Sequence, residues 1–325
     1  MLSFPSPKMI KTNGIDMAVY EDGPKDGIPV VLCHGFPELA YSWRHQMPAL
    51  AAMGYHVLAP DQRGYGLTSR PDAIDEYDME HLTADLVGLL DAFNISKAIF
   101  CGHDWGGVVA WNMPMHHASR VKGVISLNTP FFPRPPFDPI TGLRAAYGDD
   151  MYMVEFQKPG EADALLAKDT ARTFRFFMRR NVLSQEEFRA ASPEVHRLAL
   201  LHAFASDEKD WRGELLLTAE EFKVYVETYM RTGFTGGINW YRNLTRNWQR
   251  SAAITQIVTV PSLMILAEDD VVLPPRLADR MEEYVPDLEK AVIPRCGHWT
   301  QQERPDETNA IMIDWLKRRF IPGLD

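Results

Sequence analysis

Short apolar segments alternate with stretches of helical periodicity through the first 127 residues of the chain. The apolar segments predict buried strands at Pro29–Cys33, His56–Ala59, Ala98–Gly102 and Val121–Leu127. The helical stretches between these strands are Tyr41–Met53, Asp78–Phe93 and Trp105–His117. Parallel strands need crossover connections, which are usually helices that cover both faces of the sheet. The alternation therefore predicts an α/β fold built around a mostly parallel sheet.

The alternation stops at a proline-rich segment. Five prolines lie within residues 130–139, and proline at this density continues neither a strand nor a helix. Between residues 147 and 248 no strand pattern is apparent, and helical patterns such as Asp163–Arg180 and Ala219–Arg231 take its place. We therefore expect a helical segment to be inserted into the α/β fold.

The strand pattern returns near the C-terminus. Ser262–Ala267 and Lys290–Ile293 predict buried strands, and Thr308–Arg319 predicts a helix after them. The expected organisation is a core in two parts with a helical cap between them, at residues 1–135, 249–325 and 136–248 respectively.

The charge balance argues against nucleic acid and anionic membranes as partners. Lys and Arg number 34 and Asp and Glu number 44, which gives a net charge of −10. The sequence has no run of about 18 apolar residues, so no membrane-spanning helix is expected. Its first residues lack the apolar core of a signal peptide. The cysteines are odd in number and widely spaced, which is not typical of a disulfide framework; they are Cys33, Cys101 and Cys296. We expect a cytoplasmic protein.

The segment Gly102-His103-Asp104-Trp105-Gly106-Gly107 joins a predicted strand to a predicted helix. Small residues at such a turn are typical of a nucleophile elbow, whose strained backbone raises one side chain above the sheet. That side chain is Asp104. A carboxylate is already ionised and suits displacement at a saturated carbon, whereas a serine there suits acyl transfer. We predict that Asp104 is a nucleophile; the alternative is a simple helix N-cap.

A glycine loop follows the first predicted strand and is expected to face the elbow. This loop is His34-Gly35-Phe36-Pro37. Open α/β sheets bind their ligands at the carboxyl ends of the strands, where both segments lie. The backbone N–H groups of Phe36 and Trp105 are therefore predicted to form an oxyanion hole.

An acid and a histidine follow the last two predicted strands. Asp270 lies in Glu268-Asp269-Asp270, and His298 lies in Cys296-Gly297-His298-Trp299. Nucleophile, acid and histidine in this order are expected for a nucleophile elbow. The predicted catalytic triad is therefore Asp104, Asp270 and His298.

The sequence predicts no metal site and no phosphate loop. His116 and His117 are adjacent on a helical stretch, so their side chains point apart, and no carboxylate lies at chelating spacing. The turn Asp61-Gln62-Arg63-Gly64-Tyr65-Gly66 lacks the length of a phosphate loop. We expect it to hold an ion pair between Asp61 and Arg63.

Four of these segments together resemble those of the soluble epoxide hydrolases, which belong to the α/β-hydrolase fold. They are His34–Pro37, Asp61–Gly66, Gly102–Gly107 and Cys296–Trp299. The resemblance extends from about residue 5 to residue 320 and implies an α/β-hydrolase core with a helical cap. It also implies that the substrate is a small-molecule epoxide and that no cofactor is needed.

The resemblance further implies two cap tyrosines above the nucleophile. By motif they are Tyr152, which precedes Phe156-Gln157-Lys158-Pro159-Gly160, and Tyr241, within Asn239-Trp240-Tyr241-Arg242-Asn243. Tyr147 is the alternative to Tyr152, because the segment between Tyr147 and Phe156 is variable in the family.

These residues imply a reaction in two steps. Asp104 would open the epoxide and form an ester while the phenols donate to the leaving oxygen. His298, oriented by Asp270, would then activate the water that hydrolyses the ester. The candidate pocket residues are Phe36, Pro37, Trp105, Met153, Phe156 and Trp240.

Two other functions remain open from the sequence. A haloalkane or haloacid dehalogenase also uses an aspartate nucleophile, but it must bind a halide with N–H donors, and the side chain of Phe36 offers none. A non-catalytic ligand-binding protein on a hydrolase scaffold is the second alternative. Such proteins usually lack a member of the triad, whereas this sequence has all three.

Overall fold

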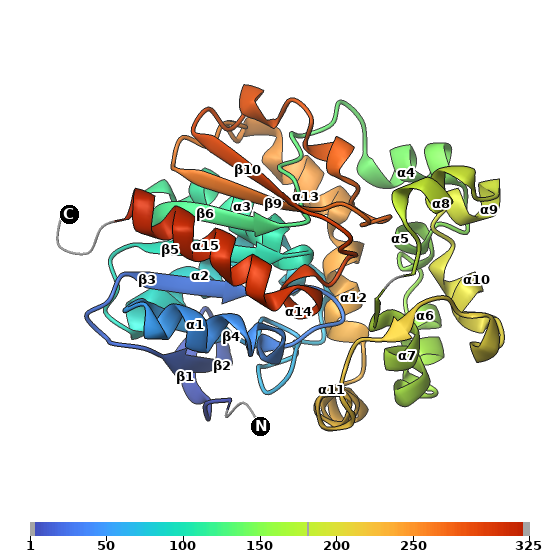
Figure 1. Cartoon of the computed structure of the whole chain (residues 1–325), viewed down its shortest axis with the longest axis horizontal. Coiled ribbons are helices and arrows are strands. Elements are labelled where there is room, and N and C mark those ends of the chain that lie inside the picture. The colour runs from blue at the N-terminus through green and yellow to red at the C-terminus, as the bar shows by residue number, and fades with distance from the viewer. Residues whose placement is uncertain (1–3, 181, 321–325) are drawn as a thin grey trace.

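A computed structural model describes residues 4–180 and 182–320, and an eight-stranded sheet forms its centre (Figure 1). The strand order is β1-β2-β4-β3-β5-β6-β9-β10. The pairs β1–β2 and β2–β4 are antiparallel, and the five pairs from β4 to β10 are parallel. The strands are β1 (Lys8–Thr12), β2 (Ile15–Asp22), β3 (Pro29–Cys33), β4 (His56–Pro60), β5 (Ala98–His103), β6 (Val121–Leu127), β9 (Ser262–Ala267) and β10 (Leu288–Ile293).

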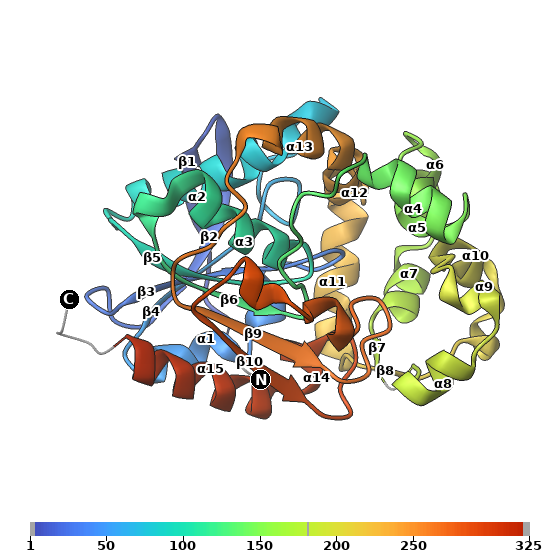
Figure 2. The same cartoon turned by 90° about the horizontal axis from the view of Figure 1, so that it is seen from above.

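Helices cover both faces of the sheet (Figure 2). One face carries α1 (Gln46–Ala52) and α15 (Pro305–Arg319), and the other carries α2 (Met79–Ala92) and α3 (Trp105–His117). Successive side chains of a strand point to opposite faces, so Leu32 packs in the cluster of α1 and α15 while Val31 packs in the cluster of α2 and α3. Burial on both faces explains why the central strands are continuous apolar runs.

The segment between β6 and β9 is mostly helical; its first seven helices lie beyond one end of the sheet and its last three lie closer to the core (Figure 1). The helices are α4 (Pro139–Tyr147), α5 (Tyr152–Glu155), α6 (Glu161–Ala167), α7 (Thr170–Phe177), α8 (Gln185–Ala190), α9 (Pro193–His196), α10 (Leu200–Ala205), α11 (Ala219–Thr232), α12 (Thr235–Arg242) and α13 (Leu244–Arg250). These helices run from Pro139 to Arg250, whereas the cap was predicted at residues 136–248. The two-residue strands β7 (Arg179–Arg180) and β8 (Glu214–Leu215) pair within it.

The structure confirms the predicted α/β core and differs from the prediction at four places in the chain. The hairpin of β1 and β2 was not predicted, and the pair β7–β8 lies where no strand was expected. The predicted helix 41–53 is a short 3-10 turn, Ala40–Trp43, followed by α1. The predicted helix 163–180 is divided into α6 and α7, because Asp169 leaves the helical conformation and caps the second of them.

The prediction of an ion pair between Asp61 and Arg63 is wrong. The buried Arg63 guanidinium donates from Nε and Nη2 to both carboxylate oxygens of Asp85 on α2, at 2.7 Å each. Asp61 instead accepts from the backbone N–H groups of Ala40 and Leu67. Arg63 thus reaches out of the turn to make the two parallel hydrogen bonds that guanidinium and carboxylate groups favour, while both oxygens of Asp61 accept from backbone donors.

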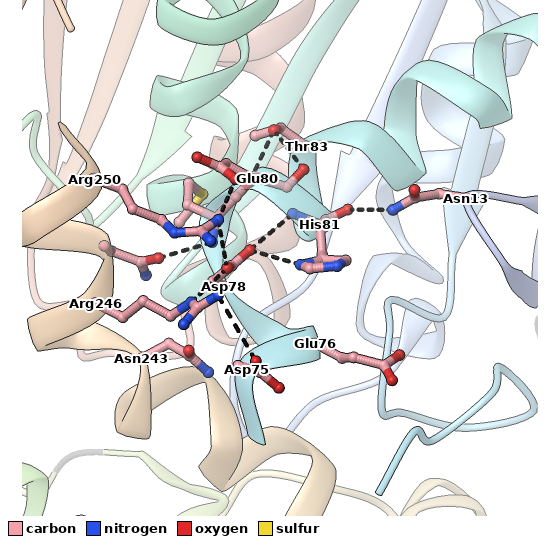
Figure 3. A network of polar contacts seen from close by, with 12 residues as sticks. Asn13, Asp75, Glu76, Asp78, Glu80, His81, Thr83, Asn243, Arg246 and Arg250 are labelled. Carbon is pink, nitrogen blue, oxygen red and sulfur yellow. Dashed lines mark hydrogen bonds and ion pairs between the residues drawn. The ribbon is translucent and has the colours of Figure 1, made fainter. Parts of the chain in front are cut away.

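Polar contacts hold α13, the last helix before β9, against the core (Figure 3). We call the group formed by Asp78, His81, Arg246 and Arg250 the Asp78 junction. Asp78 caps the N-terminus of α2 by accepting from the backbone N–H of His81. Its carboxylate also accepts from Arg246 Nε at 2.8 Å and Arg250 Nη1 at 3.1 Å, both on α13. Across the same boundary, the Nδ2 of Asn243 donates to the carbonyl of Ile74 at 2.6 Å.

Two further features bear on the expectations about partners. Among the helices of the described residues, none combines the length and the apolar character needed to cross a membrane. The three cysteines are free thiols and all are buried.

Candidate active site

Asp104 stands at a strained turn between β5 and α3. Its backbone has φ 53° and ψ −122°, a conformation that residues with a side chain rarely adopt. Two glycines make this turn sterically possible. A Cβ on Gly102 would lie 2.0 Å from the carbonyl oxygen of Gly106, and a Cβ on Gly106 would lie 1.9 Å from that of Cys33. The predicted elbow is therefore present, and it raises Asp104 above the carboxyl end of the sheet.

The two carboxylate oxygens of Asp104 face different partners. Oδ1 accepts from the backbone N–H of Phe36 at 2.8 Å, and the backbone N–H of Trp105 is a second donor to the carboxylate. Oδ2 lies 3.7 Å from Nε2 of His298. Burial raises the pKa of Asp104 above its usual value, while the charges of His298 and His103 and the two N–H donors oppose that rise. The backbone N–H groups predicted as the oxyanion hole thus both donate to the carboxylate of the nucleophile.

His298 and Asp270 meet as the sequence order predicted. Nδ1 of His298 lies 2.9 Å from Oδ2 of Asp270, which is fully buried. Burial would lower the pKa of His298, but the charge and hydrogen bond of Asp270 outweigh it and raise that pKa to about 9. Asp270 is held ionised in return. Burial alone would raise its pKa, but His298 and the hydrogen-bond donors of Leu273 and Asn128 lower it to about 2.

Both cap tyrosines chosen by motif face the same space. Tyr152 begins α5 and Tyr241 lies in α12; both are buried, and their ring centroids are 5.9 Å apart. Burial, and then the charge of Asp104, raise the pKa of each phenol well above its usual value, so both keep their protons. The alternative, Tyr147, is half-buried at the end of α4 and does not line the cavity.

A cavity of about 1110 Å³ opens above Asp104. Its wall is mostly apolar and includes Phe36 and Phe156 from the predicted pocket, together with both phenols and His298. The other predicted pocket residues are not in this wall: Pro37, Trp105, Met153 and Trp240. The ring of Trp240 is buried behind the wall, where Nε1 donates to the carbonyl of Arg63. That of Trp105 packs edge-on against Tyr241, with centroids 5.0 Å apart.

A buried pair beside the nucleophile was not predicted. Nδ1 of His103 lies 2.8 Å from Oε2 of Glu38, and Nε2 lies 2.7 Å from the backbone carbonyl of His298. Each ring nitrogen of His103 therefore faces an oxygen acceptor, a carboxylate on one side and a backbone carbonyl on the other. Glu38 Oε2 also accepts from the N–H of Gly35, so the pair links the oxyanion loop to the histidine loop.

Asn128 is a second residue that sequence reasoning missed. It follows β6, and its Nδ2 donates to Oδ2 of Asp270 at 2.7 Å. The only signal in the sequence was its place after a predicted strand, which it shares with the triad residues. No group of three or more His, Cys, Asp or Glu residues suited to a metal ion occurs within 4–180 and 182–320.

Comparisons with known proteins agree with this geometry. Residues 28–305 match the family model described as alpha/beta hydrolase fold. The chain is 44% identical to "Epoxide hydrolase A" of Mycobacterium tuberculosis over 96% of this chain and 97% of that protein. It is 42% identical to "Bifunctional epoxide hydrolase 2" of Mus musculus over 94% of its length, but spans only 54% of that longer relative.

Solved structures of epoxide hydrolases also superpose on the chain. The crystal structure of epoxide hydrolase A from Mycobacterium thermoresistibile gives a TM-score of 0.86 at 42% identity, covering 96% of this chain and 98% of that one. Potato epoxide hydrolase I gives a TM-score of 0.82 at 33% identity, with coverage of 96% and 99%. The chain therefore belongs to the α/β-hydrolase fold family and, within it, to the epoxide hydrolases.

Proposed function

We propose that this protein converts small-molecule epoxides to vicinal diols through a covalent ester on Asp104. The observation that carries the proposal is that the two carboxylate oxygens of Asp104 have different partners. Oδ1 accepts from the N–H of Phe36, and Oδ2 lies 3.7 Å from Nε2 of His298, a residue that lines the cavity. An oxygen already held by backbone donors is suited to become the carbonyl oxygen of an ester.

In the first step, Oδ2 of Asp104 attacks an epoxide carbon and the carbon–oxygen bond of the ring breaks. The electron pair stays on the epoxide oxygen, which takes one proton from one of the two phenols, Tyr152 or Tyr241, while the other phenol donates a hydrogen bond to it. Their raised pKa values keep both phenols protonated over the physiological range, so both can donate. The product of this step is a hydroxyalkyl ester of Asp104.

In the second step, His298 takes a proton from a water molecule, and the oxygen of that water attacks Cγ of Asp104. The negative charge that develops on Oδ1 is stabilised by the N–H groups of Phe36 and Trp105. The bond between Cγ and Oδ2 then breaks, and the leaving oxygen recovers the proton from His298. A diol departs. The second proton of the water is left on the Asp104 carboxyl and returns, by way of solvent, to the phenolate formed in the first step, so Asp104 is restored as a carboxylate with one oxygen from water.

The two phenols favour an epoxide over a haloalkane as substrate. A halide leaves as a stable anion and needs no proton, whereas the oxygen of an opening epoxide becomes a strongly basic alkoxide unless it is protonated. Two neutral phenols opposite Asp104 match the second requirement. We also propose a reducing compartment such as the cytoplasm for this protein, because its three cysteines are free and buried.

The experiment that tests the covalent mechanism is a single turnover of styrene oxide in water enriched in oxygen-18, with protein in excess. The oxygen added to the substrate should come from Asp104, so the first diol should be largely unlabelled. The label should appear in the peptide that contains Asp104. A fully labelled first diol, with no label in the protein, would mean that water attacks the epoxide directly and would overturn the proposal.

A variant separates the two steps. His298→Gln should form the ester but fail to hydrolyse it, because Asp104 needs no base in order to attack. Intact-mass measurement should then show one added equivalent of substrate per chain. An unmodified variant that still binds substrate would count against the role given to His298.

A further inference from the structure

We propose that Asp78 is a positioning residue for ring opening, because it holds α13 against the core and thereby fixes the place of Tyr241 above Asp104. The inference rests on the proposed function, since Tyr241 has its task only when an epoxide opens. Asp78 itself lies in the Asp78 junction, outside the cavity wall (Figure 3).

The Asp78 carboxylate is the buried centre of the junction. It is fully buried and lies within bonding distance of four groups: the backbone N–H and Nδ1 of His81, Arg246 Nε and Arg250 Nη1. Asp75 and Glu80 also approach these arginines, but their side chains are 61% and 53% exposed. Exposed ion pairs contribute little to structure. The arginine side chains are 36% and 38% exposed, but the Asp78 carboxylate is buried, so water does not replace its hydrogen bonds. Among the carboxylates that meet the two arginines, Asp78 should therefore contribute most to the position of α13.

Contacts beside Asp78 join α13 to the helix that carries Tyr241. Asn243 is both the last capping residue of α12 and the first of α13, so the two helices share a junction. Its Nδ2 donates to the carbonyls of Ile74 in the core and Asn239 in α12. Asn247 on α13 accepts from the backbone N–H of Met79, the first residue of α2. A shift of α13 would therefore be transmitted through Asn243 to α12 and its tyrosine.

The other reacting groups have different supports. Tyr152 is held within the cap, where its backbone N–H donates to the carbonyl of Leu198. The groups that hydrolyse the ester follow core strands: Asp104 after β5, Asp270 after β9 and His298 after β10. Displacement of α13 should thus affect ring opening through Tyr241 and leave ester hydrolysis unchanged. This selectivity distinguishes a positioning role from a general contribution to folding.

The test measures the two half-reactions separately in Asp78→Asn, by rapid quench and intact mass with excess styrene oxide. Ester formation should slow on the order of 10-fold or more, since small misplacements of a reacting group are costly. Ester hydrolysis should stay within about twofold of the parent rate. Arg246→Met is a second variant, which breaks the junction from α13 while leaving the cap of α2 intact. The control is Glu80→Gln, which alters an exposed partner of Arg250 and should change neither rate.

A double-mutant cycle then asks whether Asp78 acts through Tyr241. In a Tyr241→Phe background, Asp78→Asn should add little further loss, whereas in a Tyr152→Phe background it should keep its full effect. Equal slowing of both half-reactions, or an undiminished effect in the Tyr241→Phe background, would overturn the inference. If the parent forms an ester and Asp78→Asn forms it equally fast, this inference alone fails. If the parent forms no ester, the proposed function and this inference fail together.

Discussion

Replacing Asp104 with Asn should lower the pKa of His298 from about 9 to roughly 6 to 8. The substitution keeps the shape of the side chain and removes its negative charge, as ester formation would do in the reaction. Oδ2 of Asp104 lies 3.7 Å from Nε2 of His298. Two unit charges at that distance attract by roughly 1 kcal/mol at the dielectric constant of water and about 4.5 kcal/mol at an effective value of 20. At about 1.4 kcal/mol for each pKa unit, this attraction corresponds to a decrease of roughly one to three units in the pKa of His298.

The direction of this change matters for the mechanism. A histidine with a pKa of about 9 is mostly a cation at neutral pH and cannot accept a proton. Loss of the Asp104 charge lowers that pKa, so a larger fraction of His298 becomes a neutral base once the ester has formed. The hydrolysis rate of the ester should accordingly rise with pH through the lowered pKa and then level off.

Histidine-selective NMR titration can measure the change directly, with the signal assigned by its loss in His298→Gln. Asp150→Asn is the matched control, because Asp150 also lines the cavity but is not among the groups that raise the pKa of His298. The control should leave that pKa at about 9. A value that also stays at about 9 in Asp104→Asn would refute the idea that ester formation activates the base.

Three further perturbations address other parts of the site. Tyr152→Phe or Tyr241→Phe alone should slow ester formation about 10- to 150-fold, the cost of roughly 1.5–3 kcal/mol for a hydrogen bond to a developing charge, and the double variant should form no ester in rapid-quench experiments. A double variant with near-parental rate would contradict the assignment. Gly35→Ala would place a Cβ 2.4 Å from that of the nucleophile, so intact mass should detect no ester; normal ester formation would show that the loop can yield. Asn128→Ala removes the 2.7 Å hydrogen bond to Asp270 and should slow ester hydrolysis about 10-fold, or roughly 1.4 kcal/mol, in single-turnover assays; an unchanged hydrolysis rate would exclude a positioning role.

The sequence was sufficient to predict the catalytic triad, because each of its members follows a buried strand. Parallel strands bring their carboxyl ends to one edge, so Asp104, Asp270 and His298 could be expected to meet although far apart in the chain. The chemistry of a carboxylate at the elbow then limited the reaction type. The choice between Tyr147 and Tyr152 depended on where α4 ends and α5 begins, which the variable segment between them did not reveal.

Contacts between distant segments were beyond the reach of the sequence. Glu38 and His103 are 65 residues apart, and Asp78 and Arg246 are 168 apart, so no periodicity or spacing connects either pair. The hairpin of β1 and β2 was missed for a different reason. β1 is an edge strand whose apolar Met9 is 53% exposed, so it lacks the buried apolar run that identifies the central strands.

The cap leaves the sheet after β6 and returns at β9, and these two strands are neighbours that pair directly. The core therefore closes around the insertion without any change in its strand order. Loop-closure entropy grows only with the logarithm of loop length, at about 0.6 kcal/mol for each doubling, so an insertion here can lengthen or shorten at little cost. Such a fold is open to modular evolution. A cap of different size could bring new acids or a new cavity shape to the same core, and selection for new substrates could proceed while the machinery for ester hydrolysis is inherited unchanged.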